Sequence, residues 1–308
     1  MELPPYVLLD KAVGETPLQC MEAWRQTQPS EYANLPLTYA GRLDPMASGK
    51  LLVLIGEECK RKEQYLALDK TYQFSVLLGI GSDTHDVLGR LHTDTFLQTE
   101  DLSSGALRAT RPSLTVPDDL SVLETQLRGI CEQLTGDIEL PYPHFSSKTV
   151  QGKPLHMWTL EGRLHEISIP TKASTIYSLQ LNNIETKTRA AVCTEARAKI
   201  DTIPEVTEAS KTLGNNFRRV DVRQDWEQIK NWPTSDVGQL DWSGSLALPE
   251  QYKIAHFTCA ASSGTYMRTL AKLIGQKLTT PIPSLAWSIH RTQIGVFNSE
   301  TQRWRKEF

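Results

Sequence analysis

An aspartate followed by a proline stands out in the stretch 38-TYAGRLDPMASGKLLVLIG-56. Asp44 precedes Pro45, and a residue before proline is disfavoured in the interior of a helix. A carboxylate in such a place often forms an N-cap or an Asx turn. It can instead act as a nucleophile if a loop holds it at the end of a buried strand. The residues alone leave both interpretations of Asp44 open.

Two further side chains could complete a site around this carboxylate. Tyr72 lies in 70-KTY-72 at the start of a strand-like segment, where a half-buried structural tyrosine is the simpler interpretation. Arg268 follows 263-SGTYM-267 at the start of an expected helix, where the helix dipole disfavours a cation without an anionic partner. Asp44 would be such a partner, so the sequence indicates an aspartate–arginine pair.

Patterns for other chemistries are missing from the sequence. It contains no Gly-rich nucleotide-binding loop and no Gly-x-Ser-x-Gly elbow. Its seven histidines are dispersed, without metal-ligand spacing. The cysteines are odd in number and scattered, which indicates reduced thiols that fill the core rather than a disulfide framework or a zinc site. They are Cys20, Cys59, Cys131, Cys193 and Cys259.

The segments before and after Asp44 must position it. We expect a strand at Tyr6–Leu9 and a helix near Leu18–Thr27 ahead of it. Residues 41–49 form the loop that carries the carboxylate, and Leu51–Ile55 form a buried strand directly behind it. A charged helix is expected around Glu57–Leu66.

The segments around Tyr72 alternate between strands, turns and one clear helix. Residues 72–80 are rich in strand formers and end in the turn residues of 81-GSDTHDVLG-89. Residues 101–119 show no period and are expected to form a surface loop. Apolar residues recur at helical spacing from Leu120 to Leu134, and Gly136 closes that helix. The Pro-rich residues 138–158 are expected to be extended.

Arg268 belongs to a strand–turn–helix unit at 252–278. A strand enters the Ser-Ser-Gly turn, and we expect Ser262, Ser263 or Thr265 to cap the helix that follows. Arg268 lies off the apolar stripe of this helix. The residues expected to form that buried stripe are Leu270, Leu273, Ile274 and Leu278.

The bulk composition sets broad limits. With 308 residues, 39% of them hydrophobic, the chain can bury a core in one large domain or two smaller ones. A net charge of -3 argues mildly against a nucleic-acid partner, although a local basic patch can coexist with it. No basic leader with a long apolar run is present, and Leu51–Ile55 is too short to cross a bilayer. We therefore expect a cytoplasmic protein with no membrane segment.

Four blocks together resemble the TruB-type pseudouridine synthases, the family that makes pseudouridine 55 in the T-arm of tRNA. The stretch 41-GRLDPMASG-49 matches the family pattern Gly-x-Leu-Asp-Pro-x-Ala-x-Gly around its catalytic aspartate. Three further blocks follow in family order, and the resemblance covers most of the chain. They are 70-KTYQFSVLLGIGSDTHDVLG-89, 262-SSGTYMRTLA-271 and 291-RTQIGVF-297.

The resemblance implies an α+β fold of the pseudouridine synthase type. That fold is a mixed, mainly antiparallel β-sheet with flanking helices and a central active-site cleft. We expect residues 1–308 to form a single catalytic domain, with an insertion at about 186–250 that is atypical of the family. Only a short tail follows Phe297, so we expect no separate C-terminal PUA domain.

The resemblance also implies catalytic roles. Asp44 would attack the target uridine, at the ribose C1′ or the ring C6. Tyr72 would stack on the base and help to remove the C5 proton. Arg268 would pair with Asp44 and keep it ionised, because an opposite charge favours the charged form. The base detaches, turns and re-bonds through carbon without a redox change, so we expect neither cofactor nor metal.

The positions expected to contact RNA depart from the family pattern in two places. Tyr39 stands where the family usually has a histidine, five residues before the aspartate. In 145-FSSKT-149, Thr149 occupies the usual lysine position and Lys148 lies one place earlier, a shift that turns a side chain to the other face of a strand. The residues expected to bind the RNA substrate are Tyr39, Arg42, Lys11, Lys70, Lys148 and Tyr266.

Three functions follow from these observations. The leading hypothesis is a monomeric RNA pseudouridine synthase that acts on tRNA uridine 55. The alternative is a non-catalytic homologue that binds or folds RNA, which the altered RNA-contact positions and the acidic balance favour. A small-molecule hydrolase based on Asp44 ranks last, since it would need a second acid–base carboxylate or a metal.

Overall fold

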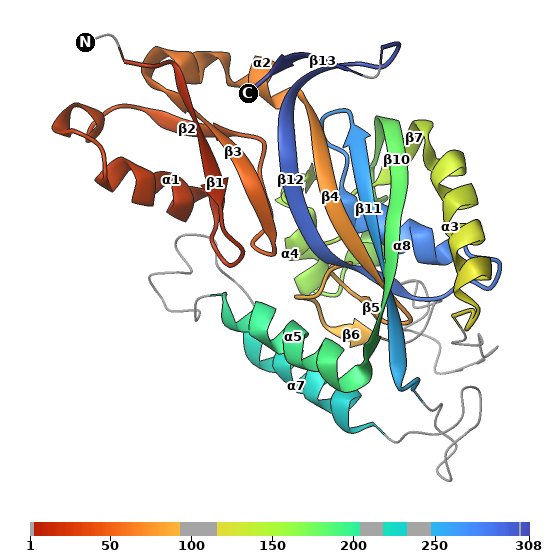
Figure 1. Cartoon of the computed structure of the whole chain (residues 1–308). Coiled ribbons are helices and arrows are strands. Elements are labelled where there is room, and N and C mark those ends of the chain that lie inside the picture. The colour runs from red at the N-terminus through yellow and green to blue at the C-terminus, as the bar shows by residue number, and fades with distance from the viewer. Residues whose placement is uncertain (1–2, 93–115, 204–217, 233–247, 302) are drawn as a thin grey trace.

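One mixed sheet forms the framework of the computed structural model, which describes residues 3–92, 116–203, 218–232, 248–301 and 303–308 (Figure 1). Most of the loop expected at 101–119 and part of the region 186–250 lie outside these residues. The strands follow the order β1 (Tyr6–Lys11), β3 (Ala47–Ile55), β12 (Ser284–Asn298), β4 (Asp69–Leu78), β11 (Gln251–Ala261), β10 (Thr171–Thr188) and β7 (Gly136–Pro141). At the margins, β2 (Leu37–Ala40) pairs with β3, and β13 (Arg303–Glu307) pairs with β12.

Neighbouring strands in this sheet run antiparallel, with one exception among the described strands. β3 and β12 are parallel, with Ile289 opposite Ala47 and Arg291 opposite Gly49. Gly49 has a φ of +99°, and a Cβ added there would lie 2.3 Å from the carbonyl oxygen of Arg291. A glycine is therefore required where these two strands meet. The expected α+β fold with a mixed, mainly antiparallel sheet is confirmed.

The apolar run of β3 is explained by burial on both faces of the sheet. Leu51 and Val53 face the cluster under α1 (Pro17–Gln26), together with Cys20 and Met21. Leu52 and Leu54 face a second cluster on the opposite side of the strand. A strand covered on both sides needs apolar residues at every position, in contrast to the alternation of a half-exposed strand.

The remaining helices flank the sheet. α3 (Leu120–Leu134) packs on β10, and α8 (Met267–Gln276) packs on β12 and β4 (Figure 1). α2 (Lys62–Leu66) lies against β2, and α4 (Leu155–Leu160) belongs to the segment after β7. Short strand pairs complete the described structure. They are β5 (Gly81–Ser82) with β6 (Leu91–His92), and β8 (Thr149–Val150) with β9 (Lys153–Pro154).

Helix ends show where local sequence signals succeed and where they fail. At α1, Thr16 and Gln19 form a reciprocal capping box, and Pro17 opens the helix. The expected cap of α8 by Ser262, Ser263 or Thr265 is wrong. Tyr266 is the N-cap residue without a side-chain hydrogen bond, because the hydroxyl of Thr265 donates instead to the carbonyl of Ser262 at 2.9 Å.

Several expected boundaries need correction. β3 begins at Ala47, so the loop that carries Asp44 is shorter than residues 41–49. The charged helix after it starts with a 3₁₀ segment, Gly56–Arg61, before α2. Residues 138–158 are not extended throughout, since they end in the first turn of α4. In the stripe of α8, Leu273 is only partly buried, whereas Arg268 is 4% exposed.

The described part of the region 186–250 contributes two antiparallel-looking helices below the sheet (Figure 1). α5 (Arg189–Asp201) is capped by Thr188, whose hydroxyl accepts from the amide of Ala191 at 3.2 Å. α5 packs against α7 (Arg219–Asn231) and also against β10 and β11. This helix pair therefore shares the main core instead of forming a separate one.

Candidate active site

Asp44 lies on the short loop between β2 and β3. The amide of Ala47 donates to the carbonyl of Asp44, and the amide of Gly14 donates to the carbonyl of Pro45, both at 2.9 Å. These bonds tie the loop to its own strand and to the turn after β1. The side chain of Asp44 is 34% exposed. Its backbone is therefore fixed while its carboxylate can still be reached from outside.

Arg268 binds this carboxylate through one nitrogen of its guanidinium group. Its Nε donates to Oδ2 of Asp44 at 2.8 Å. The other two nitrogens donate to the carbonyls of Thr84 at 2.8 Å and Phe145 at 3.2 Å. The side chain is only 5% exposed, so these three bonds fix its orientation. The aspartate–arginine pair expected from the sequence is present.

A second carboxylate, Asp86, lies beside the same arginine. Its Oδ2 is 3.7 Å from Nε of Arg268, and its Oδ1 accepts from the hydroxyl of Thr84 at 2.7 Å and the amide of Leu88 at 2.9 Å. Burial raises the pKa of Asp86 to about 6, although the charge of Arg268 opposes this rise. The site residues predicted from the sequence do not include Asp86. Its place in the block at residues 70–89 is the sequence feature that could have indicated it.

The two carboxylates keep Arg268 charged. Burial alone would lower the pKa of Arg268, but the charges of Asp44 and Asp86 outweigh that effect and raise it. A buried guanidinium between two carboxylates is an ion triad whose members depend on one another, since removing one leaves an uncompensated charge. Arg268 can therefore hold the carboxylate of Asp44 in a fixed direction.

Tyr72 comes to the site from the centre of the sheet. It lies on β4, opposite Cys259 on β11 and Arg291 on β12. Its phenol is partly buried and interacts with the guanidinium of Arg291, and burial raises its pKa, with a smaller contribution from the charge of Asp44. Tyr72 is thus joined through Arg291 to the start of the loop that carries Asp44.

Arg291 is a further site residue that the sequence did not assign, although it opens the block at residues 291–297. It is 1% exposed, and its guanidinium donates to the carbonyls of Lys50 at 2.7 Å and Gly41 at 3.1 Å. These bonds connect the start of the Asp44 loop and the strand that follows it, β3, to β12. Arg291 thus supports the loop and also orients Tyr72.

Aromatic and cationic side chains gather at the entrance to this site. Tyr266, directly before α8, meets the ring of Tyr142 edge-on at 5.6 Å. The amine of Lys148 lies 5.2 Å from the centre of the Tyr142 ring. Arg42 is exposed and its charge acts on Tyr266, whose pKa is raised by burial and by Asp44. Such rings and cations suit the stacking and phosphate contacts of a single-stranded nucleotide.

Lys11 and Lys70, expected to contact RNA, are instead 0% and 4% exposed. The amine of Lys11 donates to the carbonyls of Ala12 at 2.8 Å and Glu15 at 2.7 Å. The amine of Lys70 donates to the carbonyls of Leu66 and Leu68. Burial lowers the pKa of Lys11 to about 8 and that of Lys70 to about 7. Both lysines therefore hold backbone turns around the site and do not face a ligand.

Tyr39 lies on β2, just before the loop that carries Asp44. It packs against the cluster that contains Leu51 and Val53, and the amine of Lys62 lies 5.6 Å from its ring centre. Its ring is only partly buried. Tyr39 can thus present one edge to a ligand while the rest of the ring packs on the sheet.

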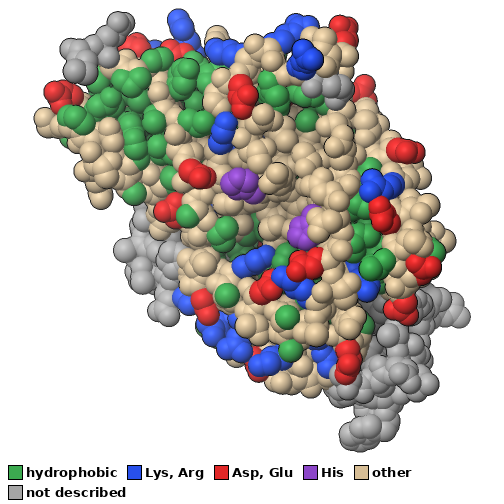
Figure 2. Space-filling view, in the orientation of Figure 1, with side chains coloured by type: hydrophobic (Ala, Val, Ile, Leu, Met, Phe, Trp, Pro, Cys, Tyr) green, Lys and Arg blue, Asp and Glu red, His purple; other side chains and the backbone are tan. Residues whose placement is uncertain are grey.

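On the viewed face, Lys and Arg gather over α2 and β13 and again over α5 and α7, and hydrophobic side chains cover much of β1–β3 (Figure 2). In the described part of the chain, many cations are engaged in ion pairs within the protein. The pairs include Lys60 with Glu57, Arg61 with Glu58, Lys153 with Glu161, and Arg163 with Glu166.

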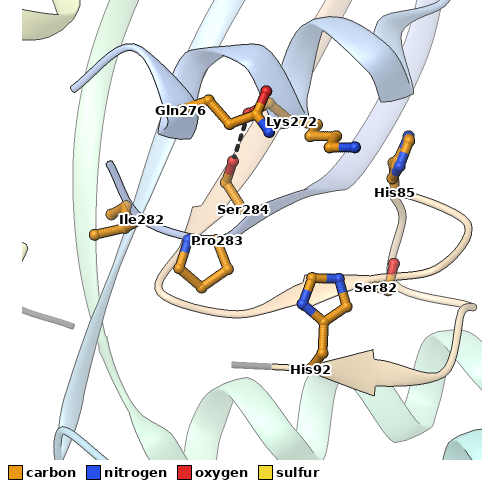
Figure 3. Close-up of a pocket in the computed structure, with 8 residues that line it drawn as sticks. All are labelled: Ser82, His85, His92, Lys272, Gln276, Ile282, Pro283 and Ser284. Atoms are coloured by element: carbon orange, nitrogen blue, oxygen red, sulfur yellow. Dashed lines mark hydrogen bonds between the residues drawn. The ribbon is translucent and has the colours of Figure 1, made fainter. Parts of the chain in front are cut away.

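A small pocket lies behind the loop that carries Thr84 and Asp86. Its volume is about 20 Å³, room for about one water molecule. Figure 3 shows the amine of Lys272 pointing toward the imidazole of His85 across this pocket. His85 has a φ of +61°, and burial lowers its pKa well below the usual value, so the ring is neutral. This pocket is too small for a nucleotide.

The described residues contain no group of three or more His, Cys, Asp or Glu side chains that could hold a metal ion. In the same part of the chain, no helix combines the length and the apolar composition that a membrane crossing needs.

Comparison with known families gives one match. Residues 36–203 match the TruB family pseudouridylate synthase (N terminal domain). These residues include the Asp44 loop, Tyr72, Asp86 and α5, and they make up more than half of the 308 residues.

Individual proteins and solved structures are similar to parts of this chain. A tRNA pseudouridine synthase B from Caldicellulosiruptor saccharolyticus is 28% identical over 177 residues, which cover 58% of this chain and 51% of the relative. The tRNA pseudouridine synthase 4 of Saccharomyces cerevisiae is 24% identical over 295 residues, which cover 89% and 67%. The structure titled "Crystal Structure of a Cbf5-Nop10-Gar1 Complex" aligns with a TM-score of 0.45 at 15% identity, over 94% of this chain and 48% of the other. The chain spans about half the length of the bacterial relatives that it matches.

Proposed function

Because the chain belongs to the TruB family of pseudouridylate synthases, we propose that it converts a uridine of RNA to pseudouridine, with Asp44 as the nucleophile. The observation that carries this proposal is the Asp44–Arg268 pair. The arginine is buried and held by three bonds, while the carboxylate that it holds is one-third exposed. Such a carboxylate is aimed and accessible, and it is paired with a cation, which is what nucleophilic catalysis requires.

The reaction needs few groups from the protein. Asp44 attacks the uridine at the ribose C1′ or the ring C6, and the bond between C1′ and N1 breaks. The base turns, its C5 bonds to C1′, and Asp44 leaves. C5 then loses its proton and N1 gains one, so the product is an isomer of the substrate. Tyr72 stacks on the turning base and assists the removal of the C5 proton.

Recognition of the substrate falls to the aromatic and cationic side chains at the entrance. A uridine flipped out of its stack can lie against Tyr266 and Tyr142, while Arg42 and Lys148 contact the flanking phosphates. We propose tRNA as the RNA and uridine 55 of the T-arm as the target. The names of the relatives support tRNA. The single-domain organisation, the monomeric state and the cytoplasmic location belong to the same proposal.

The test uses an unmodified tRNA transcript and a matched transcript with cytidine at position 55. Wild-type protein is expected to form pseudouridine only in the first. Asp44→Asn keeps the shape but removes the nucleophile, and activity should fall on the order of 10⁴-fold or more. Asp118→Asn is the matched control, because Asp118 is an exposed aspartate far from the loop in sequence.

Each outcome separates one part of the proposal from another. Pseudouridine at a different uridine would overturn the assignment of position 55 but keep the enzyme. If wild type and Asp44→Asn are equally inactive on tRNA and on total RNA, the proposed enzymatic function is rejected. If both proteins then bound RNA with the same affinity, the non-catalytic RNA-binding alternative would replace it.

A further inference from the structure

Arg218 connects the α5–α7 helix pair to the active site. It directly precedes α7, and its two terminal nitrogens bind both carboxylate oxygens of Asp83, at 2.7 Å and 2.9 Å. The plane of its guanidinium group also lies over the ring of Phe145, 4.6 Å from the ring centre. One side chain thus joins two segments that are far apart in the sequence, the loop at residues 81–91 and the segment after β7.

These are the same two segments that hold Arg268. Arg268 donates to the carbonyl of Thr84, the residue after Asp83, and to the carbonyl of Phe145 itself. Arg268 is 5% exposed and Arg218 is 27% exposed. The two arginines therefore bind one pair of segments, one from the interior and one from near the surface.

The loop at residues 81–91 depends on such outside support. His85 within it adopts a left-handed conformation that is unfavourable for a residue other than glycine. α7 adds two further contacts to this loop. The indole of Trp226 donates to the carbonyl of Val87 at 3.2 Å, and Arg90 pairs with Asp225 at 2.7 Å.

We propose that Arg218 is a positioning residue for catalysis. It holds the carbonyls of Thr84 and Phe145 at the spacing that aims Arg268 at Asp44, and it makes α5–α7 a structural part of the active site. This inference rests on the proposed function. A shift of about 1 Å in catalytic geometry can reduce a rate on the order of 100-fold, so a partly exposed clamp is expected to affect turnover by less than that.

Arginine is required here because of its shape. The flat guanidinium binds both oxygens of Asp83 and stacks on Phe145 at the same time, and an ammonium group can do neither in this way. A lysine would keep the charge but would bind only one oxygen. The charge of Arg218 could also serve to contact an RNA phosphate. A measurement of RNA binding by the variants distinguishes that role from the positioning of Arg268.

The experiment compares Arg218→Ala, Arg218→Lys and Asp83→Asn with Arg223→Ala. Arg223 is the matched control, because it lies on the same helix and its ion pair is with Asp201 on α5. With the same tRNA transcript, kcat of Arg218→Ala should fall about 10-fold while KM changes less than about twofold. Arg218→Lys should restore kcat only in part, Asp83→Asn should also lower it, and Arg223→Ala should match wild type.

Amide hydrogen exchange provides a readout that needs no activity. Arg218→Ala should speed exchange in residues 83–88 while the amides of β4 and β11 keep their protection. An unchanged kcat with unchanged exchange would overturn the inference, and a raised KM with normal kcat would assign Arg218 to RNA binding instead. If wild type is inactive, the proposed function fails, and the exchange data still decide whether the clamp exists.

Discussion

The ion pairs of the Asp44 site and those between α5 and α7 differ in their burial. At the site, one arginine is almost fully buried and each of its nitrogens has a fixed acceptor. Between the helices, Arg197 pairs with Glu227 and Arg219 with Asp201, and all four side chains are between 22% and 42% exposed. Removing one partner of a buried ion pair costs much stability, because it leaves an uncompensated charge away from water. Removing one partner of an exposed ion pair costs little, because water solvates the other.

The helix pair is held by apolar contacts instead. Trp226 is fully buried and meets the ring of Trp287 edge-on at 6.0 Å. The contrast teaches that the number of ion pairs in a region does not measure their importance. The buried apolar residues of α5 and α7 are Val192, Cys193, Ala196, Ile200, Val222, Trp226 and Ile229.

The largest effect is expected at the buried arginine. Arg268→Lys keeps a cation between Asp44 and Asp86 but cannot also donate to the carbonyls of Thr84 and Phe145. We expect kcat to fall on the order of 100-fold, because preorganised donors are lost from the site. Single-turnover kinetics on a tRNA transcript measures this. Activity near that of wild type would mean that only the charge of Arg268 matters.

The next effect is expected in the apolar seam of the helix pair. Trp226→Ala should lower the free energy of unfolding by about 3–5 kcal/mol, because a large buried ring leaves a cavity. Trp226→Phe keeps most of the volume and loses the bond to the carbonyl of Val87, so it should cost about 1 kcal/mol. Urea denaturation of the two variants and wild type gives both values. Equal losses would assign the stability to the hydrogen bond.

The buried carboxylate of Asp86 should make the free energy of unfolding depend on pH. The pKa of Asp86 is about 6 in the folded protein and 3.8 by reference, so the folded state holds the proton more tightly. The contribution of Asp86 to stability is then present below about pH 4 and lost as pH rises through 6. Asp86→Asn removes this titration, so the difference in free energy of unfolding between wild type and variant should change by up to ~3 kcal/mol between pH 4 and 7, with wild type losing stability as pH rises. Urea denaturation at several pH values checks this, and parallel pH curves would contradict it.

The smallest effect is expected at the exposed ion pair. Arg197→Ala removes the pair with Glu227 between α5 and α7 and should change the free energy of unfolding by less than about 1 kcal/mol. Thermal or urea unfolding at low and high salt measures the change. A loss comparable to that of Trp226→Ala would abolish the distinction between the two regions.

Local patterns predicted much of the fold and the centre of the site. The apolar run after Asp44 indicated a buried strand, and the helical spacing from Leu120 to Leu134 gave α3 at its correct limits. Arg268 at the start of a helix required an anion, and the structure supplies Asp44. These features succeed because each depends on residues close together in the sequence or on an unpaired charge.

Other features depend on contacts that no local pattern encodes. Lys11 and Lys70 have the charge of RNA contacts, but the sequence does not show that backbone carbonyls surround their amines. Asp86 and Arg291 act through partners on distant strands and loops. The predicted cap of α8 is wrong for the same reason. The sequence shows three candidate hydroxyls in one turn but not which backbone groups they bind.

The parallel pairing of β3 with β12 has a consequence for the order of folding. Ser48 and His290 lie opposite each other in this pairing but are 242 residues apart, and Asp44 and Arg268 are 224 residues apart. Contacts between such distant segments form slowly, and during synthesis they must wait for the later segment. A growing chain on the ribosome therefore carries Asp44 long before Arg268, and the pair between them can form only as the last strands of the sheet are added.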